Sequence, residues 1–392
     1  MTRITEVREV AVNLRAEIRN SLIDFSKMTV SLVAVVSDWR VEGKPAVGLG
    51  FNSIGRYAAS GILRERFIPR LLEPSPDEYA GEADGELDPG RIRDLMMRNE
   101  KPGGHGERSG AVAAIEIAAW DLAAKLRGVP LYQLLADRFN GGGFDRRVDV
   151  YAAGGYYYPE DGVARLIDEM RGYLEQGYTH LKMKIGGAPL DEDCKRVEAV
   201  LSLVGDGARL AVDANGRFDL ETAIAYAERL QPYGLRWFEE PGDPLDFALQ
   251  AQLADYYREP FATGENLFSH QDVRNLLRFA GLDRGRDFLQ MDPALSYGVV
   301  ELARMLDAMR GEDWSPRRLI PHGGHLMALH MAAGMQLGGN ESYPGVFQPF
   351  GGFGAVHQVV EGAIEIADTP GAGLEHKAEL EPVLAQLIGD LS

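Results

Sequence analysis

The chain has 392 residues, of which 45% are hydrophobic and 26% charged, a balance typical of a folded globular protein. Its 59 acidic and 41 basic residues leave a formal net charge of −18, which argues against a nucleic acid or an anionic membrane as partner. The single cysteine, Cys194, excludes an intrachain disulfide and a cysteine-ligated metal cluster. The length suits one large α/β barrel with a smaller domain, or two to three ordinary domains. With polyanionic partners disfavoured, a small-molecule ligand is our expectation.

Neither the N-terminal residues nor the longest uncharged stretch favours a membrane span or an export signal. Residues 1–30 carry charges throughout and lack the apolar core of a signal peptide. The longest uncharged stretch, residues 322–340, contains several glycines and histidines, which make it a poor membrane span. These features predict a cytoplasmic protein that does not bind a membrane.

The first part of the chain places strand-like segments before helical ones. Segments rich in β-branched residues at 4–14, 28–36 and 46–50 predict strands. The alanine-rich stretch 111–126 predicts a helix that ends before Gly128. Strands grouped before helices indicate an α+β unit, and a glycine-rich break follows at 141–143. We therefore expect an α+β domain over residues 1–140.

The second part alternates short apolar runs with helical stretches. The runs lie at residues 148–152, 180–185, 209–212, 236–238, 260–263, 287–291 and 318–321, with a weaker eighth at 335–340. Amphipathic segments such as 222–230 and 299–309 separate them. Alternation of strands and helices indicates βα units and a parallel sheet. Seven or eight such units predict a (β/α)8-type barrel over residues 141–354.

Polar side chains follow nearly every predicted barrel strand. They are Lys182 and Lys184, Asp213 and Asn215, Glu239 and Glu240, Glu265 and Asn266, Asp292, His322 and Glu341. From Lys184 to His322 the successive strand-end residues are 29, 26, 26, 27 and 30 positions apart. One βα unit takes about 30 residues, so each of these side chains returns to the same mouth of the barrel. Active sites of such barrels lie at that mouth.

Three of these carboxylates predict a metal site. Asp213, Glu239 and Glu265 follow three consecutive strands and would repel one another without a cation. Oxygen ligands without cysteine or histidine favour Mg²⁺, with Mn²⁺ as a substitute. We expect such an ion to bind a substrate carboxylate.

Two lysines and a histidine provide candidates for acid–base chemistry. Lys182 and Lys184 are two residues apart on one strand, so both side chains point to the same face. Two neighbouring ammonium groups beside a divalent cation would lower the lysine pKa, which makes Lys184 a candidate general base. Asp292 and His322 follow adjacent strands, where the carboxylate can hold one imidazole nitrogen and leave the other for substrate.

The order and spacing of the motifs resemble the enolase superfamily, in particular its mandelate racemase-like subgroup. The motifs are AAIEIAAWDLAAKLRGVPLYQLL, KMKIGG, VDANG, WFEEP, TGEN, QMD, PHGGH and NES, and they extend over essentially the whole chain. Asp292 occupies the position where the muconate-lactonising subgroup has a lysine. The resemblance implies an α/β fold with a modified (β/α)7β barrel. It also implies an N-terminal α+β capping domain that a C-terminal segment at 355–392 completes.

The resemblance also implies a reaction and a role for each site residue. Mg²⁺ held by Asp213, Glu239 and Glu265 would assist removal of the proton α to a carboxylate. Within the subgroup the lysine pair is most similar to that of D-tartrate dehydratases, which convert D-tartrate to oxaloacetate and water. Lys184 would be the base, His322 the acid for the departing hydroxyl, and Asp292 its partner. Lys182 and Glu341 would contact the substrate carboxylate.

Substrate selection and assembly are less constrained by the motifs. Further substrate contacts are expected from the capping residues Ser21, Gly55 and Lys101 and from the barrel residues Tyr156 and Asn266. The same residues would also suit another acid-sugar dehydratase or a racemase or epimerase of 2-hydroxy acids. A non-catalytic binding protein on a barrel fold is the alternative from another class. A homo-oligomer is usual among proteins of this kind.

Overall fold

Three antiparallel strands open the chain and form a separate sheet. The computed structural model describes residues 1–83, 85–158 and 162–391, and this sheet has the order β1 (Ile4–Asn13), β2 (Thr29–Val41), β3 (Lys44–Phe51). All three predicted strands are confirmed, but β2 ends at Val41 rather than at residue 36. The extension continues to a tight turn in which Glu42 and Gly43 both have positive φ, 52° and 85°, as a two-residue hairpin requires.

Helices cover one face of this sheet. They are α1 (Ser60–Ile62), α2 (Ile68–Leu72), α3 (Pro89–Met97), α4 (Glu107–Arg127) and α5 (Leu131–Phe139). The predicted helix at 111–126 lies within α4, which ends at Gly128 in the left-handed conformation. Helix α4 packs so closely on β3 that a Cβ at Gly48 would lie 2.0 Å from the Ala118 carbonyl oxygen. The small residues of the two elements therefore allow their backbones to meet.

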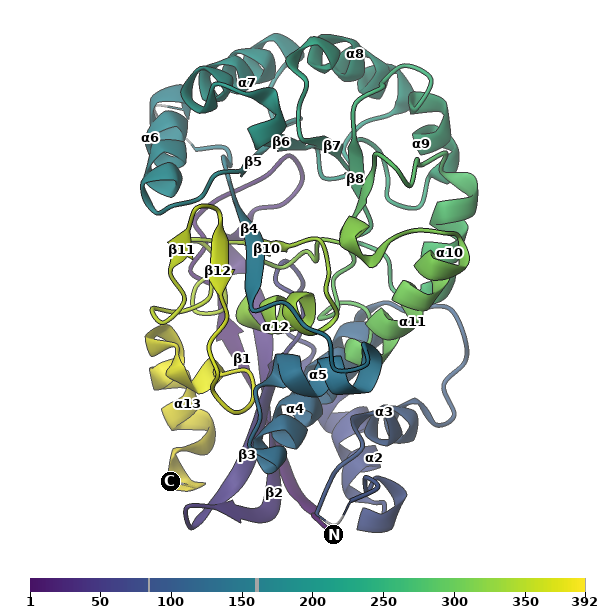
Figure 1. Ribbon diagram of the computed structural model, residues 1–392, viewed down its shortest axis with the longest axis vertical. Coiled ribbons are helices and arrows are strands. Elements are labelled where there is room, and N and C mark those ends of the chain that lie inside the picture. The colour runs from purple at the N-terminus through teal and green to yellow at the C-terminus, as the bar shows by residue number, and fades with distance from the viewer. Residues whose placement is uncertain (84, 159–161, 392) are drawn as a thin grey trace.

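Parallel strands form a ring in the second part of the chain (Figure 1). They are β4 (Arg147–Gly154), β5 (Leu181–Lys184), β6 (Leu210–Asp213), β7 (Trp237–Glu239), β8 (Phe261–Thr263), β9 (Phe288–Leu289) and β10 (Asn340–Ser342). Residues 319–321 take the place between β9 and β10, because Ile320 N–H donates to the Leu289 carbonyl and Glu341 N–H to the Pro321 carbonyl. Since β10 pairs with β4, the ring closes.

A helix follows each ring position except the last. These helices are α6 (Gly162–Glu175), α7 (Leu190–Val204), α8 (Leu220–Leu230), α9 (Phe247–Leu253), α10 (His270–Phe279), α11 (Val299–Gly311) and α12 (Leu326–Gly334). After β10 the chain continues into a loop, so the predicted (β/α)7β barrel is confirmed. The eighth strand was predicted too early, at 335–340. Gly339 there has φ 145° and packs against the Asp149 carbonyl oxygen, and the strand begins only at Asn340.

The C-terminal segment returns from the barrel to the first sheet. Strands β11 (Val359–Val360) and β12 (Ala363–Glu365) form a hairpin on the outer edge of β4. Helix α13 (Glu381–Ile388) then packs beside β1, where the Arg8 guanidinium donates to the Leu387 carbonyl at 3.0 Å. Both chain ends lie near the first sheet (Figure 1). This contact agrees with a capping domain completed by the C-terminal segment, and the domain limits at 140 and 354 stay predictions.

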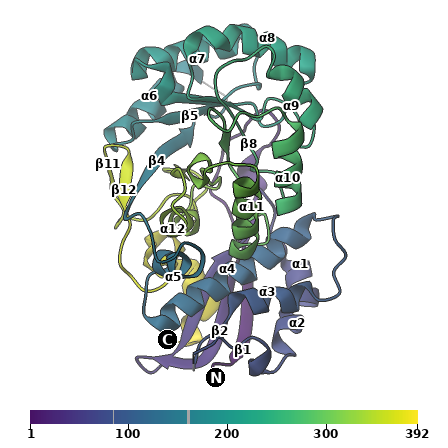
Figure 2. The same cartoon turned by 45° about the vertical axis from the view of Figure 1, so that its right-hand side comes forward.

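A buried carboxylate joins the capping helices to the barrel. Glu116 of α4 is fully buried and accepts the backbone N–H groups of Val299 and Val300, the first residues of α11, at 2.8 and 3.0 Å. Figure 2 shows α11 standing on α4. Burial raises the pKa of the Glu116 carboxyl to about 7, since the two N–H donors and Trp120 offset only part of the lost hydration. Among the described residues, no helix is long and apolar enough to cross a lipid bilayer.

The raised pKa of Glu116 predicts a pH-dependent stability. The folded protein binds this proton more tightly than the unfolded chain. The contribution of Glu116 to the free energy of unfolding is therefore greatest below the ordinary pKa of 4.5, and it falls as the pH rises through about 7. We expect the wild type to lose stability relative to Glu116→Gln as the pH rises across this window, measured by urea unfolding. Glu107→Gln, an exposed change on the same helix, is the control. A pH-independent difference between wild type and Glu116→Gln would contradict this prediction.

Candidate active site

Three carboxylates meet where β6, β7 and β8 end. Asp213 and Glu239 are the last residues of paired strands and lie directly opposite each other in the register, while Glu265 follows β8 by two residues. One oxygen from each of the three lies within 4.8 Å of the others. Asp213 and Glu239 are fully buried, and the buried Glu265 Oε2 has no hydrogen-bond donor among the described residues.

The donor set fits a hard divalent cation. Burial raises the pKa of the Glu239 carboxyl to about 8, and the neighbouring Asp213 adds to the rise. Close buried carboxylates repel one another, so a cation is needed to balance them. Oxygen-only ligands favour Mg²⁺ or Mn²⁺ over softer metals. The predicted cluster of Asp213, Glu239 and Glu265 is therefore brought together in a form suited to such an ion.

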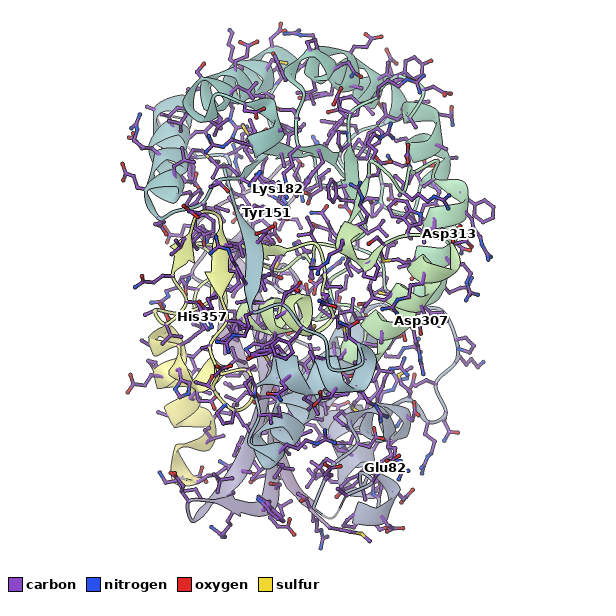
Figure 3. All side chains as sticks on the ribbon, viewed as in Figure 1. Glu82, Tyr151, Lys182, Asp307, Asp313 and His357 are labelled. Carbon is purple, nitrogen blue, oxygen red and sulfur yellow. The ribbon has the colours of Figure 1, made fainter. Side chains whose placement is uncertain are left out.

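The two lysines of β5 point into the ring, each toward carboxylates. Figure 3 shows Lys182 beside Tyr151 inside the ring, and its ammonium lies 5.6 Å from the Tyr151 ring centre. The Lys182 Nζ is 2.6 Å from Glu239 Oε1 and 2.7 Å from Glu341 Oε1. Lys184 Nζ is 2.5 Å from Asp213 Oδ2.

The charges around Lys182 shift its pKa upward. Burial disfavours its charged form, but the carboxylates of Glu239 and Glu341 outweigh burial and raise the Lys182 pKa well above its ordinary value. Sequence reasoning considered the second lysine and a cation beside Lys182, and it did not place two carboxylates in direct contact with the ammonium. Lys182 is therefore held as a cation among its neighbours.

His322 is held between carboxylates on both ring nitrogens. Nδ1 lies 3.1 Å from Asp292 Oδ2, so the predicted contact of this pair is confirmed. Nε2 lies 2.9 Å from the Tyr343 hydroxyl and 3.4 Å from Glu265 Oε2. Burial disfavours the imidazolium, but Glu265, Glu341 and Asp292 outweigh burial and raise the His322 pKa to about 10.

Asp292 is itself fixed by donors from two directions. The Ser53 hydroxyl, from the segment after β3, donates to Asp292 Oδ2 at 2.6 Å. The Ala294 N–H donates to Oδ1 at 2.8 Å. Burial alone would raise the Asp292 pKa, but the hydrogen bond and charge of His322, with help from Ser53, lower it below its ordinary value. The carboxylate therefore stays ionised and orients the imidazole.

A cavity of about 400 Å³ lies over these groups, between the barrel and the capping segments. Of the predicted site residues, its lining includes Gly55, Tyr156, Lys184, Glu265, Asn266 and His322. The fully buried residues Lys182, Asp213, Glu239, Asp292 and Glu341 are not in that lining.

Two predicted capping contacts also lie outside the cavity lining. The Ser21 hydroxyl donates to the Ala214 carbonyl at 3.0 Å. Lys101 is exposed on the loop before α4, where its carbonyl accepts a hydrogen bond from Arg108. Their predicted role in substrate binding stays a prediction.

Sequence reasoning missed three polar residues of this site. Tyr343, the residue after β10, contacts His322. Ser53 contacts Asp292, and Arg56 lines the cavity. Tyr343 lies two residues after Glu341 of the NES motif, which was the one available signal. Ser53 and Arg56 lie on either side of Gly55, which was predicted as a capping contact, but no motif marks either residue.

The chain matches known families along most of its length. Residues 86–136 match the mandelate racemase/muconate lactonizing enzyme N-terminal domain, and residues 165–380 match the family described as enolase C-terminal domain-like. The protein belongs to the enolase superfamily. The resemblance that the motifs indicated is thereby confirmed, as is the capping-domain-and-barrel fold of the superfamily.

Curated members of this superfamily that resemble the chain act on acid sugars. L-talarate/galactarate dehydratase of Salmonella typhimurium is 31% identical over 74% of this chain and 68% of that enzyme. Arabinonate dehydratase of Saccharolobus solfataricus is 30% identical, but the match spans only 61% of this chain and 58% of that enzyme. A solved racemase from Streptomyces coelicolor A3(2) with bound magnesium covers 99% of both chains at 25% identity and a TM-score of 0.77.

The carboxylate cluster predicts that Mg²⁺ stabilises the folded protein. A ligand present at about 100 times its dissociation constant adds about 2.7 kcal/mol to the free energy of unfolding. We expect added Mg²⁺ to raise the melting temperature of the wild type and to have little effect on Asp213→Asn. Asp307→Asn is the control, because that side chain is 75% exposed and outside the cluster. An equal rise in Asp213→Asn would exclude Asp213 as a ligand.

Proposed function

We propose that the protein is a Mg²⁺-dependent dehydratase of a hydroxy-carboxylic acid of the acid-sugar class. The observation that carries this proposal is that Lys184 and His322 reach the same cavity from different sides of the ring, next to the carboxylate cluster. A candidate base and a candidate acid beside one substrate site are what elimination of water requires. The acid-sugar dehydratases among the relatives support the same class.

The first half of the reaction removes the proton next to the substrate carboxylate. When bound, Mg²⁺ at Asp213, Glu239 and Glu265 supplies charge that stabilises the negative charge developing on that carboxylate. Lys184, as a neutral amine, accepts the α-proton on Nζ while the electron pair of the C–H bond moves toward the carboxylate. Lys182 and Glu341 form a buried ion pair at 2.7 Å that holds the floor of the site in place.

The second half expels the β-hydroxyl group. His322, protonated and oriented by Asp292, donates its Nε2 proton to the hydroxyl oxygen as the C–O bond breaks, and water leaves. The raised His322 pKa fits an imidazolium that is available near neutral pH. The resulting enol loses its O–H proton and takes up a proton at the β-carbon, and the product is a 2-keto acid. Atoms balance, because the substrate loses one proton and one hydroxyl group as water.

Our finer proposal is that the substrate is D-tartrate, with oxaloacetate as product. It rests on the similarity of the Lys182–Lys184 pair and of the motif layout to D-tartrate dehydratases. A second candidate is racemisation or epimerisation of a 2-hydroxy acid. The fold match to a racemase at 25% identity favours it, and the same base and acid could exchange a proton on opposite faces of one carbon.

A substrate panel separates these candidates. Purified protein with Mg²⁺ is incubated with D-tartrate, its stereoisomers, and a set of aldonic and aldaric acids, and 2-keto acid is measured. We expect keto acid from D-tartrate, and no turnover after chelation of the metal. Keto acid from another acid sugar alone would overturn the tartrate proposal and keep the dehydratase. An epimerised product without keto acid would favour the racemase candidate.

Exchange of the α-proton in D₂O tests the roles of the two residues. We expect Lys184→Ala to lose both deuterium exchange and dehydration, each by about 100-fold or more. We expect His322→Asn to lose dehydration but to retain exchange, since the base is intact. His376→Asn, an exposed change far along the chain, is the control. Full exchange in Lys184→Ala would show that another group is the base, and absence of any exchange in the wild type would favour a non-catalytic protein.

A further inference from the structure

Arg56 is a cation that the capping domain presents to the active-site cavity. It lies in the segment after β3 and is half-buried in the cavity lining. The segment is anchored to the barrel, because Ser53 donates its hydroxyl to Asp292 and its N–H to the Ala294 carbonyl at 3.1 Å. The Arg56 N–H in turn donates to the Ser53 carbonyl at 3.3 Å. The backbone of Arg56 is therefore hydrogen-bonded to Ser53, the residue that holds Asp292.

A chain of polar contacts orients the Arg56 guanidinium. Its Nη2 donates to Asn266 Oδ1 at 2.5 Å. The amide nitrogen of Asn266, Nδ2, donates to the buried Glu240 carboxylate at 2.9 Å. This contact turns the amide oxygen of Asn266 toward the arginine. The guanidinium carbon also lies 6.0 Å from the Phe268 ring centre. One donor of Arg56 is thus engaged, and its other N–H groups have no protein acceptor among the described residues.

Arg56 differs from the other basic groups of the cavity because it has no carboxylate partner in the described part of the chain. Lys184 lies 2.5 Å from the Asp213 carboxylate, and His322 lies 3.1 Å from the Asp292 carboxylate. Among the described residues, no carboxylate lies within ion-pair distance of the Arg56 guanidinium. A planar, half-buried guanidinium with free N–H groups is suited to bind a carboxylate through two parallel hydrogen bonds. The acceptor that fits the cavity is therefore an anionic group of the ligand.

We propose that Arg56 binds the second carboxylate of a dicarboxylic substrate, and that it selects diacids over monoacids. The inference rests on the proposed dehydratase function and assigns the residue that recognises the second carboxylate of its substrate. The reacting end of the substrate lies among Lys184, His322 and the carboxylate cluster, which come from the barrel, whereas Arg56 approaches from the capping domain. A ligand with an anionic group at each end would contact both.

The other cation considered for this role is less well placed. Lys101 is exposed, outside the cavity lining, on a loop held by its backbone to Arg108. Tyr156 does line the cavity, but its hydroxyl carries no charge, and burial raises its pKa well above the ordinary value. Arg56 therefore offers the full positive charge that a second carboxylate needs.

The test compares acids that differ only at the far end. Galactarate and D-galactonate form one matched pair, and D-tartrate and D-threonate another, because each monoacid carries a primary alcohol where its diacid partner carries the second carboxylate. We expect the wild type to prefer the diacid, and Arg56→Gln to lower the diacid-to-monoacid ratio of kcat/KM by about 10- to 100-fold, mainly through KM. Arg56→Lys should retain part of the preference, since it keeps the charge but not the planar fork.

A control separates this role from a general loss of structure. Arg64→Gln changes an arginine that lies outside the cavity lining and whose side chain is 65% exposed, and it should keep the wild-type ratio. Equal losses on both acids of a pair in Arg56→Gln, or a collapse of the ratio in Lys101→Gln instead, would overturn the proposal. Calorimetry with the non-reacting pair succinate and butyrate gives a readout independent of turnover. Loss of succinate binding in Arg56→Gln would support the diacid site even if no acid were dehydrated, whereas unchanged binding would refute it.

Discussion

The crowding of charge at the barrel mouth is the constraint on which the site depends. Four carboxylates, Asp213, Glu239, Glu265 and Glu341, lie around the ammonium groups of Lys182 and Lys184. Buried charges are costly unless they are paired, and here the acidic groups outnumber the lysines. Burial, and after it the neighbouring Asp213, raise the Glu239 pKa. A divalent cation at the cluster would restore the balance and leave Asp213 shared between the metal site and Lys184. The proposed base, Lys184, and the carboxylate cluster are therefore parts of one electrostatic system.

The two parts of the fold divide the work of this system. The ring supplies the reacting groups, because parallel strands deliver each strand end to the same mouth. The capping domain covers the cavity and contacts the barrel through hydrogen bonds of individual side chains. These join Ser53 to Asp292, Arg56 to Asn266, and Glu116 to the start of α11. Because Ser53 holds Asp292, a displacement of the capping segment would also displace the carboxylate that orients the His322 imidazole. The segment that lines the cavity thus also helps to orient the proposed acid.

Much of this arrangement was predictable because spacing along a βα barrel is regular. The strand-end residues from Lys184 to His322 recur at the length of one βα unit, and that alone brought the metal cluster and the Asp292–His322 pair together correctly. The apolar run at 335–340 suggested the eighth strand. Gly338 and Gly339 lie within that run but outside the strand, which begins only at Asn340. Gly55 of the same loop was predicted to contact substrate, but the contacts of Ser53 and Arg56 were not, since an irregular loop takes up its position only by packing on the barrel. The carboxylate contacts of Lys182 could not be predicted for the same reason: the nearest charges come from β7 and β10, far away in sequence.

The net charge of −18 and an anionic substrate are reconciled by the distance over which each acts. At physiological salt the Debye length is about 8 Å, so most surface carboxylates are screened from a ligand inside the cavity. The field at close range comes from the groups that line it, and among the described residues these include the cations Arg56 and His322. The acidic surface instead acts on the approach of an anion, whose encounter rate it lowers at low salt. Selection by charge thus takes place after encounter, at the two ends of the bound acid.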